Sequence, residues 1–268
     1  MTQALPSSLP GPHRTFLTTL MDVVQCDARI LGVAAGGSFL TNSMDEFSDL
    51  DLILAVDPVA YENIMEERHQ IAAKLGVLLA AFTGEHIGEP RLLICLYDGN
   101  PPLHVDLKFV ELLDLARRIE DLAVLWERKG KLTRALEVGV AEFPLPDLQW
   151  IEDRFWVWVH YVTTKIGRGE LFEAIECLSY LRVNVLGPLA LLRSGHRPAG
   201  VRRFEQLAPD YIRPMQETVA THRTEECIRA LHACIDLYRL LRTDARPLRC
   251  RGAAEAGAMQ YLSDIERR

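Results

Sequence analysis

Several features that would assign this chain to a specialised class of protein are missing. No Cys-x-x-Cys pair occurs among the six cysteines and the eight histidines are scattered, so no zinc site is expected. No apolar run approaches the roughly 18 residues that a membrane span needs. The first residues lack a basic segment followed by an apolar one, so no signal peptide is predicted. We therefore expect a cytoplasmic protein that does not bind a membrane.

An excess of positive charge is missing as well. The 268 residues include 30 Lys and Arg against 37 Asp and Glu, which gives a net charge of -7. Proteins that bind nucleic acid are usually basic because they neutralise phosphates, so a nucleic-acid partner is not expected. Hydrophobic residues make up 49% of the chain and charged residues 25%, as in globular proteins. The length suffices for one large or two ordinary domains.

The spacing of apolar residues changes along the chain. Up to residue 143 it predicts strands over 28–34, 49–56, 77–82, 91–97, 103–110 and 124–127, and helices over 13–25, 58–75 and 111–121. Phe143-Pro144-Leu145-Pro146 is typical of a linker. Beyond it, helical spacing covers 148–166, 171–192, 224–241 and 253–266, and Pro188 should kink or end the second of these helices. The sequence predicts an α/β (α+β) protein: a domain with a small mixed sheet (1–143), then a helical bundle (144–268).

One short segment carries most of the functional information. A Gly-Gly-Ser turn at residues 36–38 is followed, after ten intervening residues, by a predicted strand that begins Asp49-Leu50-Asp51. Strand side chains alternate between faces, so Asp49 and Asp51 point the same way and Leu50 points into a core. Two adjacent carboxylates raise each other's pKa, and a bound cation relieves that repulsion. Carboxylate oxygens suit Mg²⁺, which usually brings nucleotide phosphates with it.

A third acid lies on a later predicted strand. Between residues 103 and 110, His104, Asp106 and Lys108 alternate with apolar residues and therefore share one face. Asp106 would then join Asp49 and Asp51 on the polar faces of neighbouring strands. An isolated Asp-x-Asp is more often the solvent face of an edge strand. The agreement of turn, spacing, alternation and third acid favours a metal and nucleotide site instead.

These residues resemble the signature of the polymerase-β-like nucleotidyltransferase superfamily, and the resemblance covers residues 30 to 110. In that family the Gly-Ser turn, here Gly37 and Ser38, holds the triphosphate of a bound nucleotide. The Asp-x-Asp pair, here Asp49 and Asp51, binds one or two Mg²⁺. A third carboxylate completes the site. The resemblance implies that Asp106 fills this place, either as a ligand of a second metal or as the base that takes the acceptor's proton.

The residues after the turn depart from the family pattern. Many relatives carry a small residue and then a basic one soon after Gly-Ser, whereas Phe-Leu-Thr-Asn follows here. Phosphate contacts are therefore expected from Lys108, and from Lys165 and Arg168 in the second domain. Lys165 shares a predicted helix face with Trp158, where a ring could stack on a base and the ammonium could meet phosphate oxygens. The competing interpretation is that Trp156 and Trp158 are core residues and that Lys165 is solvated.

A nucleotidyltransferase domain followed by a helical bundle is similar to the antibiotic-modifying branch, the aminoglycoside and lincosamide nucleotidyltransferases. Over residues 145–268 the similarity is one of architecture. It implies Mg²⁺-dependent transfer of a nucleoside monophosphate, most simply AMP from ATP, onto a hydroxyl of a small molecule such as an aminoglycoside or lincosamide. Antibiotic resistance would follow. The expected partners are a nucleoside triphosphate and this acceptor, and the oligomeric state is left open.

Two alternatives stay open. The first is an antitoxin-like or regulatory nucleotidyltransferase that acts on a protein or an RNA. Arg154 and His160 have the Arg-x(4–6)-His spacing of the helical ribonuclease domains that are paired with such enzymes. The second is a non-catalytic nucleotide-binding protein, against which the three acids argue. Glu85 and Glu89 are lower-ranked candidates for the base, since both are more typical of a solvated loop.

Overall fold

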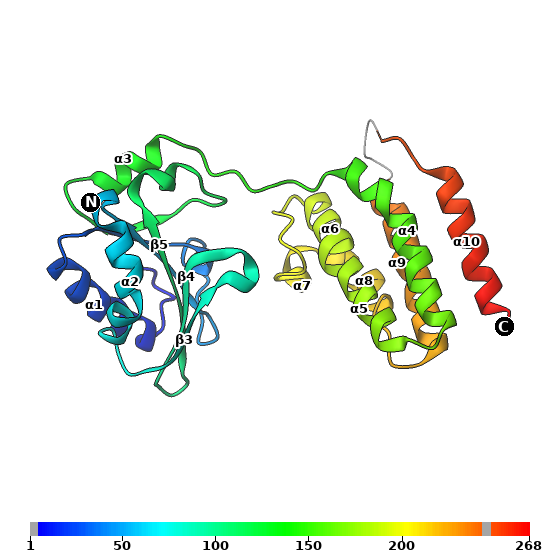
Figure 1. Cartoon of the computed structure of the whole chain (residues 1–268), viewed down its shortest axis with the longest axis horizontal. Helices are drawn as coiled ribbons and strands as arrows, with labels where there is room; N and C mark the ends of the chain where they lie inside the picture. Colours follow the sequence, from blue (N-terminus) through cyan, green and yellow to red (C-terminus); the bar gives the residue numbers. More distant parts are fainter. Residues whose placement is uncertain (1–4, 243–247) are drawn as a thin grey trace. The chain divides into compact units, whose positions relative to one another are not determined.

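The computed structural model describes residues 5–242 and 248–268, and it divides into two compact units, Met1–Phe143 and Pro144–Arg268 (Figure 1). The division falls within the Phe143-Pro144-Leu145-Pro146 segment. The helices of the first unit are α1 (Gly11–Cys26), α2 (Tyr61–Ala73) and α3 (Lys131–Glu137), with short 3₁₀ turns η1 (Gly37–Phe39), η2 (Pro58–Ala60), η3 (Glu85–Ile87) and η4 (Leu112–Ala116). Its strands are β1 (Ile30–Ala35), β2 (Leu50–Val56), β3 (Leu78–Gly84), β4 (Glu89–Tyr97), β5 (Leu103–Glu111) and β6 (Ala123–Glu127).

The six strands form one mixed sheet in the order β3-β4-β5-β2-β1-β6. Only the central pair, β2 and β5, is parallel, and every other neighbouring pair is antiparallel. A parallel pair needs a long crossover, and α2, β3 and β4 provide it here. The predicted hairpin of β4 and β5 and the predicted edge position of β6 are both confirmed.

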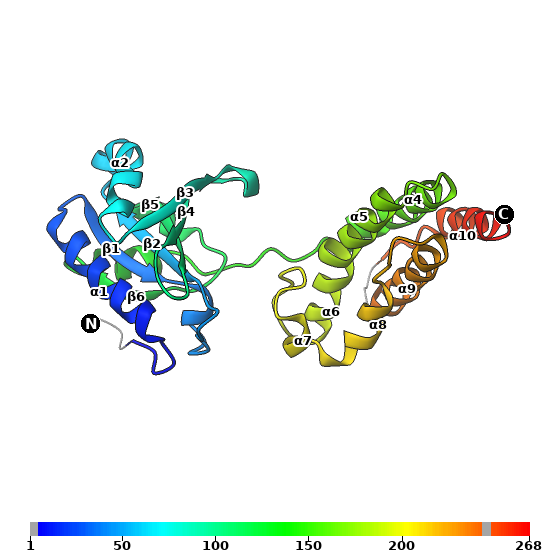
Figure 2. The same cartoon turned by 90° about the horizontal axis from the view of Figure 1, so that it is seen from below.

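Helices α1 and α2 cover one face of this sheet (Figure 2). Leu50, Leu52 and Leu54 of β2 are at most 1% exposed and belong to the core on this face, which confirms their predicted inward direction. The opposite face has a smaller cluster in which Leu132 of α3 and Leu115 of η4 pack on the strands. This cluster covers only part of the face, and the polar side chains of β2 and β5 lie on the remainder.

The second unit is built from helices, and no strand occurs among its residues 144–242 and 248–268. Its elements are α4 (Leu148–Gly167), α5 (Leu171–Leu181), a π-helical turn η5 (Arg182–Leu186), α6 (Gly187–Arg193), α7 (Phe204–Leu207), η6 (Pro209–Tyr211), α8 (Ile212–Glu217), α9 (Thr224–Arg242) and α10 (Gly252–Glu266). Their buried faces form one core. The predicted fold class, a mixed-sheet domain with a helical bundle, is therefore confirmed.

The chain stays helical through Pro188, so of the two predicted outcomes, a kink or an end of the helix, the end does not occur. Elements α5, η5 and α6 follow one another without a break, and the π-helical turn ends two residues before the proline. A wider turn at this point absorbs the missing N–H and the bulk of the ring. By length and composition the combined helix, Leu171–Arg193, could cross a membrane, which the sequence analysis did not expect. Half of its apolar window is buried in the core of the second unit, as in a bundle helix.

Candidate functional site

The Gly-Gly-Ser turn follows β1 and lies against β2. The Gly36 N–H donates a hydrogen bond to the backbone carbonyl of Asp51 over 2.9 Å. Gly37 has a φ of +58°, a conformation that favours glycine, and a Cβ added there would collide with Oδ2 of Asp51. Ser38 continues into η1 and is half-buried. Glycine is therefore required at position 37 for the turn to approach the Asp51 carboxylate this closely.

Two of the predicted acids are side by side. Because β2 and β5 are parallel neighbours in register, Asp51 lies opposite Asp106 and both side chains leave the same face of the sheet. His104 donates from Nε2 to Oδ1 of Asp106 over 3.0 Å, which orients that carboxylate. Asp49 lies one residue before β2 and is half-buried. The register thus brings together one acid of the Asp-x-Asp pair and the third acid.

A cavity of about 500 Å³ lies over this part of the sheet. Its lining is strongly charged: it includes Asp51, Asp106, Lys108, Glu89, Arg91, Asp114, Arg117, Arg118 and Glu120. Asp49 is not among the residues that line it. Asp51, Asp106 and Lys108 were predicted for the site, whereas Arg91 and Glu120 were not. Negative and positive groups line the same cavity, a composition that could hold both an anionic group and a cation.

Glu120 is a residue of the candidate site that the sequence analysis missed. The Gly37 N–H donates to Oε1 of Glu120 over 3.1 Å, although the two residues are 83 positions apart. Glu120 lies in an irregular segment between η4 and β6. Neither periodicity nor motif spacing can place a residue of such a segment, so no signal in the sequence would have found it.

The ammonium group of Lys108 forms an ion pair with Glu89. Its Nζ lies 2.7 Å from Oε2 of Glu89, and Nε of Arg91 lies 2.7 Å from Oε1 of the same carboxylate. Hydrogen bonds from Arg91 and, against the effect of burial, from Lys108 lower the pKa of Glu89 to about 2. A carboxylate that holds its proton so weakly is a poor general base. The Glu89 carboxylate therefore serves to position the side chains of Arg91 and Lys108. Glu85 is exposed on η3, and a hydrogen bond from Thr83 lowers its pKa.

The two cations predicted in the second unit also have acidic partners. Lys165 Nζ lies 2.8 Å from Glu170 and 3.0 Å from Glu173, and these contacts raise its pKa. Arg168 is exposed and lies 3.8 Å from Glu170. Their contact with a nucleotide stays a prediction. Trp156 is 1% exposed, so the competing interpretation of it as a core residue is correct.

Arg154 and His160 of α4 do not share a site. The guanidinium of Arg154 lies 4.2 Å from the centre of the Trp150 ring, whereas the His160 ring stacks on Tyr261 at 4.7 Å between ring centres. Both partners are surface contacts of the helical unit. Within residues 5–242 and 248–268, the two side chains of the Arg-x(4–6)-His spacing therefore contact different rings.

The carboxylates of the first unit suit a metal ion that substrate phosphates also bind better than one held by protein side chains alone. Within residues 5–242 and 248–268, no three His, Cys, Asp or Glu side chains are grouped so that they could hold a metal by themselves. Asp51 and Asp106 offer two carboxylates from adjacent strand positions. Mg²⁺ is commonly held by one or two carboxylates, with substrate phosphates and water as its remaining ligands. This pair matches that mode of binding.

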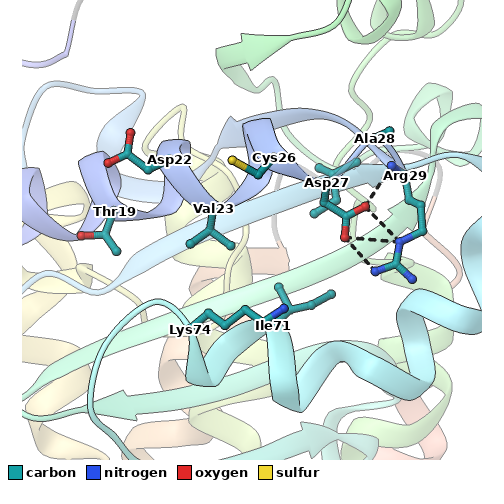
Figure 3. Close-up of a pocket in the computed structure, with 10 residues that line it drawn as sticks. Thr19, Asp22, Val23, Cys26, Asp27, Ala28, Arg29, Ile71 and Lys74 are labelled. Carbon is teal, nitrogen blue, oxygen red and sulfur yellow. Dashed lines mark hydrogen bonds and ion pairs between the residues drawn. The ribbon is translucent and has the colours of Figure 1, made fainter.

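A separate cavity of about 540 Å³ lies on the helix-covered side of the sheet, among α1, β1 and α2 (Figure 3). Asp27 accepts hydrogen bonds from Arg29, the shortest 2.7 Å long, and these lower the pKa of Asp27. Arg29 also lies 2.7 Å from Glu67. Arg29 is thus held between two carboxylates, and no residue predicted for the site lines this cavity. Its contacts serve to join α1, β1 and α2.

The turn can be tested by replacing Gly37 with alanine. Gly37→Ala should lower the free energy of unfolding by about 1 to 2 kcal/mol through its positive φ. It should also displace the Asp51 carboxylate and abolish nucleotide binding. Gly88→Ala is a matched control, because Gly88 has a φ of +75° but a Cβ there would meet nothing within 4 Å. Denaturant unfolding and calorimetric nucleotide titration would measure both effects. Equal nucleotide affinity in the two variants would contradict the role of the turn.

Comparison with known proteins gives two similar solved structures. No protein-family model matches the chain. No curated protein matches it either. An aminoglycoside 6-adenyltransferase from Bacillus subtilis is 16% identical, with 94% of this chain and 98% of that chain covered and a TM-score of 0.44. A nucleotidyltransferase-like protein from Exiguobacterium sibiricum 255-15 is 15% identical, with 96% and 80% covered and a TM-score of 0.37. Because both structures are less than 25% identical to this chain and both TM-scores are below 0.5, neither match supports a function for this chain.

Proposed function

We propose that this chain is a Mg²⁺-dependent nucleotidyltransferase that moves a nucleoside monophosphate, most simply AMP from ATP, onto a hydroxyl of a small molecule. One observation carries the proposal: the glycine turn lies against Asp51, and Asp51 lies beside Asp106 on the parallel neighbour strand. A turn with backbone N–H groups suits phosphate oxygens, and paired carboxylates suit the cation that accompanies them. The turn and the carboxylate pair therefore lie side by side, and both carboxylates line the charged cavity.

The turn, the acids and Lys108 have separate roles in this proposal. Gly37 and Ser38 bind the β- and γ-phosphates through backbone N–H and hydroxyl groups. Asp51 and Asp106, with Asp49 one residue before the strand, would hold Mg²⁺, which when bound would offset negative charge on the phosphates and on the leaving pyrophosphate. Lys108 adds a positive charge at the cavity wall.

Asp106 is also the best-placed group to take the acceptor's proton. The hydrogen bond from His104 fixes the direction of its carboxylate, and Asp106 lines the charged cavity that would receive the acceptor. The proposal is the same whether Asp106 acts as this base or as a ligand of a second metal. The low pKa of Glu89 removes that residue as a competing base.

The acceptor is proposed to be an antibiotic of the aminoglycoside or lincosamide class. A cationic aminoglycoside suits a chain with a net charge of -7, because the protein's field raises the local concentration of positive ligands. On this proposal the enzyme works in the cytoplasm and confers antibiotic resistance. Lys165 and Arg168 are retained as proposed phosphate ligands from the helical unit.

The proposal is tested by measuring pyrophosphate release. Each nucleoside triphosphate is incubated with Mg²⁺ and a panel of aminoglycosides, lincosamides and hydroxylated metabolites. We expect release that depends on one acceptor and is lost in Asp106→Asn but kept in Asp98→Asn, a control at an exposed position between β4 and β5. Labelling of a protein or RNA in lysate without any small acceptor would instead support the regulatory alternative. No release under any condition would contradict the proposal.

A further inference from the structure

The Glu120 carboxylate lies where the proposed function places a phosphate. Its Oε1 accepts the Gly37 N–H hydrogen bond at 3.1 Å. A Cβ added to Gly36 would lie 2.7 Å from the same oxygen, so the carboxylate is packed onto the backbone at both glycines. A carboxylate oxygen and a phosphate oxygen are both anionic acceptors of backbone N–H groups. Only one of them can occupy this position at a time.

The backbone that carries Glu120 is anchored independently of this contact. Arg118 Nη1 donates to the carbonyls of Leu136 and Gly139 over 3.0 and 2.9 Å, and the Glu142 N–H donates to the Arg118 carbonyl over 2.9 Å. The side chain of Glu120 is half-buried at the cavity wall. Rotation about its own side-chain bonds can therefore release the turn while the segment stays in place.

Negative charge at the turn itself adds to this competition. Glu120 shares a cavity of mixed charge with Asp51 and Asp106, and a triphosphate at the turn would bring further negative charge next to its carboxylate. A phosphate group at the turn would both compete with Glu120 for the Gly37 N–H and repel its carboxylate. The unliganded arrangement therefore opposes nucleotide binding until the Glu120 side chain moves away.

We propose that Glu120 sets the affinity for the nucleotide: its carboxylate occupies the phosphate position of the Gly36-Gly37 turn in the unliganded protein, and the nucleotide must displace it. This inference rests on the proposed function. Because part of the binding free energy is used to displace Glu120, the observed affinity is lower than the turn alone would give. Glu120 is thus a positioning residue that acts through the turn and takes no part in the chemical step.

The test removes the carboxylate. Calorimetric titration with ATP and Mg²⁺ should show about 10-fold tighter binding to Glu120→Ala than to the wild type, with a smaller gain for Glu120→Gln, whose neutral amide oxygen is a weaker competitor. Under turnover the KM for ATP should fall while kcat is kept. Glu66→Gln, an exposed position on α2, is the control and should bind as the wild type does.

The outcomes separate this inference from the function on which it rests. A wild type that binds nucleotide, together with a folded Glu120→Ala that binds it equally or more weakly, overturns the inference alone. A wild type and a folded Glu120→Ala that both fail to bind any nucleotide with Mg²⁺ contradict the proposed function and the inference together. Binding by Glu120→Ala alone would support both.

Discussion

Asp51→Asn should lower the rate of nucleotidyl transfer by about a thousandfold, since the cation at such a site supplies several kcal/mol of charge stabilisation. Asp51 lines the charged cavity, touches the turn and lies opposite Asp106. The change removes one negative charge and leaves the inward leucines of β2 in place. The free energy of unfolding should therefore change by no more than about 0.5 kcal/mol.

The rates of wild type, Asp51→Asn and Asp98→Asn should be compared at saturating Mg²⁺, together with their unfolding midpoints. Asp98→Asn makes the same chemical change at an exposed position and should keep full activity. Asp49→Asn extends the test, because Asp49 lies outside the cavity lining although the family pattern predicts it as a ligand. A large loss in Asp51→Asn with little loss in Asp49→Asn would limit the metal ligands to Asp51 and Asp106. Full activity in Asp51→Asn would disprove the metal site.

Glu152→Ala should destabilise the helical unit by about 3 to 5 kcal/mol. The change removes a buried carboxylate and leaves the groups that donate hydrogen bonds to it without an acceptor. Glu152 is 0% exposed on α4. It accepts hydrogen bonds from the Tyr238 hydroxyl at 2.6 Å, from the Arg251 N–H at 2.8 Å and from Arg242 at 3.1 Å. These groups lie on or beside α9 and α10, so a single carboxylate joins three helices.

The pKa of Glu152 gives the sign of its contribution. Burial raises this pKa, but the hydrogen bonds from Tyr238, the Arg251 amide and Arg242 outweigh burial and lower it overall. A carboxyl group with a lower pKa in the folded state stabilises the fold at neutral pH, and this contribution is lost as the pH falls through that pKa. The destabilisation by Glu152→Ala should therefore be measured at pH 7, where it is complete.

Denaturant unfolding monitored by circular dichroism would measure this loss. Glu176→Ala on α5 is the matched control, because Glu176 is exposed and the change should alter the free energy of unfolding by less than about 0.5 kcal/mol. Equal unfolding midpoints for the two variants would show that the buried carboxylate contributes little to the stability of the bundle.

The sequence predicted the elements whose side chains alternate regularly. The leucines of β2 alternate with Asp51, and this period of two indicated both the strand and its buried face. The apolar spacing of α4 and α9 likewise predicted long helices. Short elements such as α3 and α8 were missed, because seven or six residues are too few to establish a period. Pro188 does not end its helix, since a π-helical turn formed by earlier residues accommodates it.

The candidate site also contains residues that a regular pattern predicted and residues that it could not predict. Alternation placed Asp106 on a polar face, and the family pattern suggested that its strand lies near that of Asp51. The parallel pairing that sets the two opposite each other is a property of the whole sheet. Glu120 and Glu152 could not be predicted, because both depend on contacts between residues more than 80 positions apart. An acidic residue in an irregular segment or on a helix is by default expected to be solvated.

The most direct test of the central claim follows the label from ATP in the presence of Mg²⁺ and an acceptor identified by pyrophosphate release. ATP labelled at the α-phosphate should transfer its label to the acceptor, and ATP labelled at the γ-phosphate should release its label as pyrophosphate. Both the transfer of the α-label and the release of labelled pyrophosphate should disappear in Asp51→Asn. Transfer of the γ-label to the acceptor would mean phosphoryl transfer instead. That result, or unchanged α-label transfer in Asp51→Asn, would contradict a nucleotidyltransferase site built on the Gly36-Gly37 turn and the Asp51–Asp106 pair.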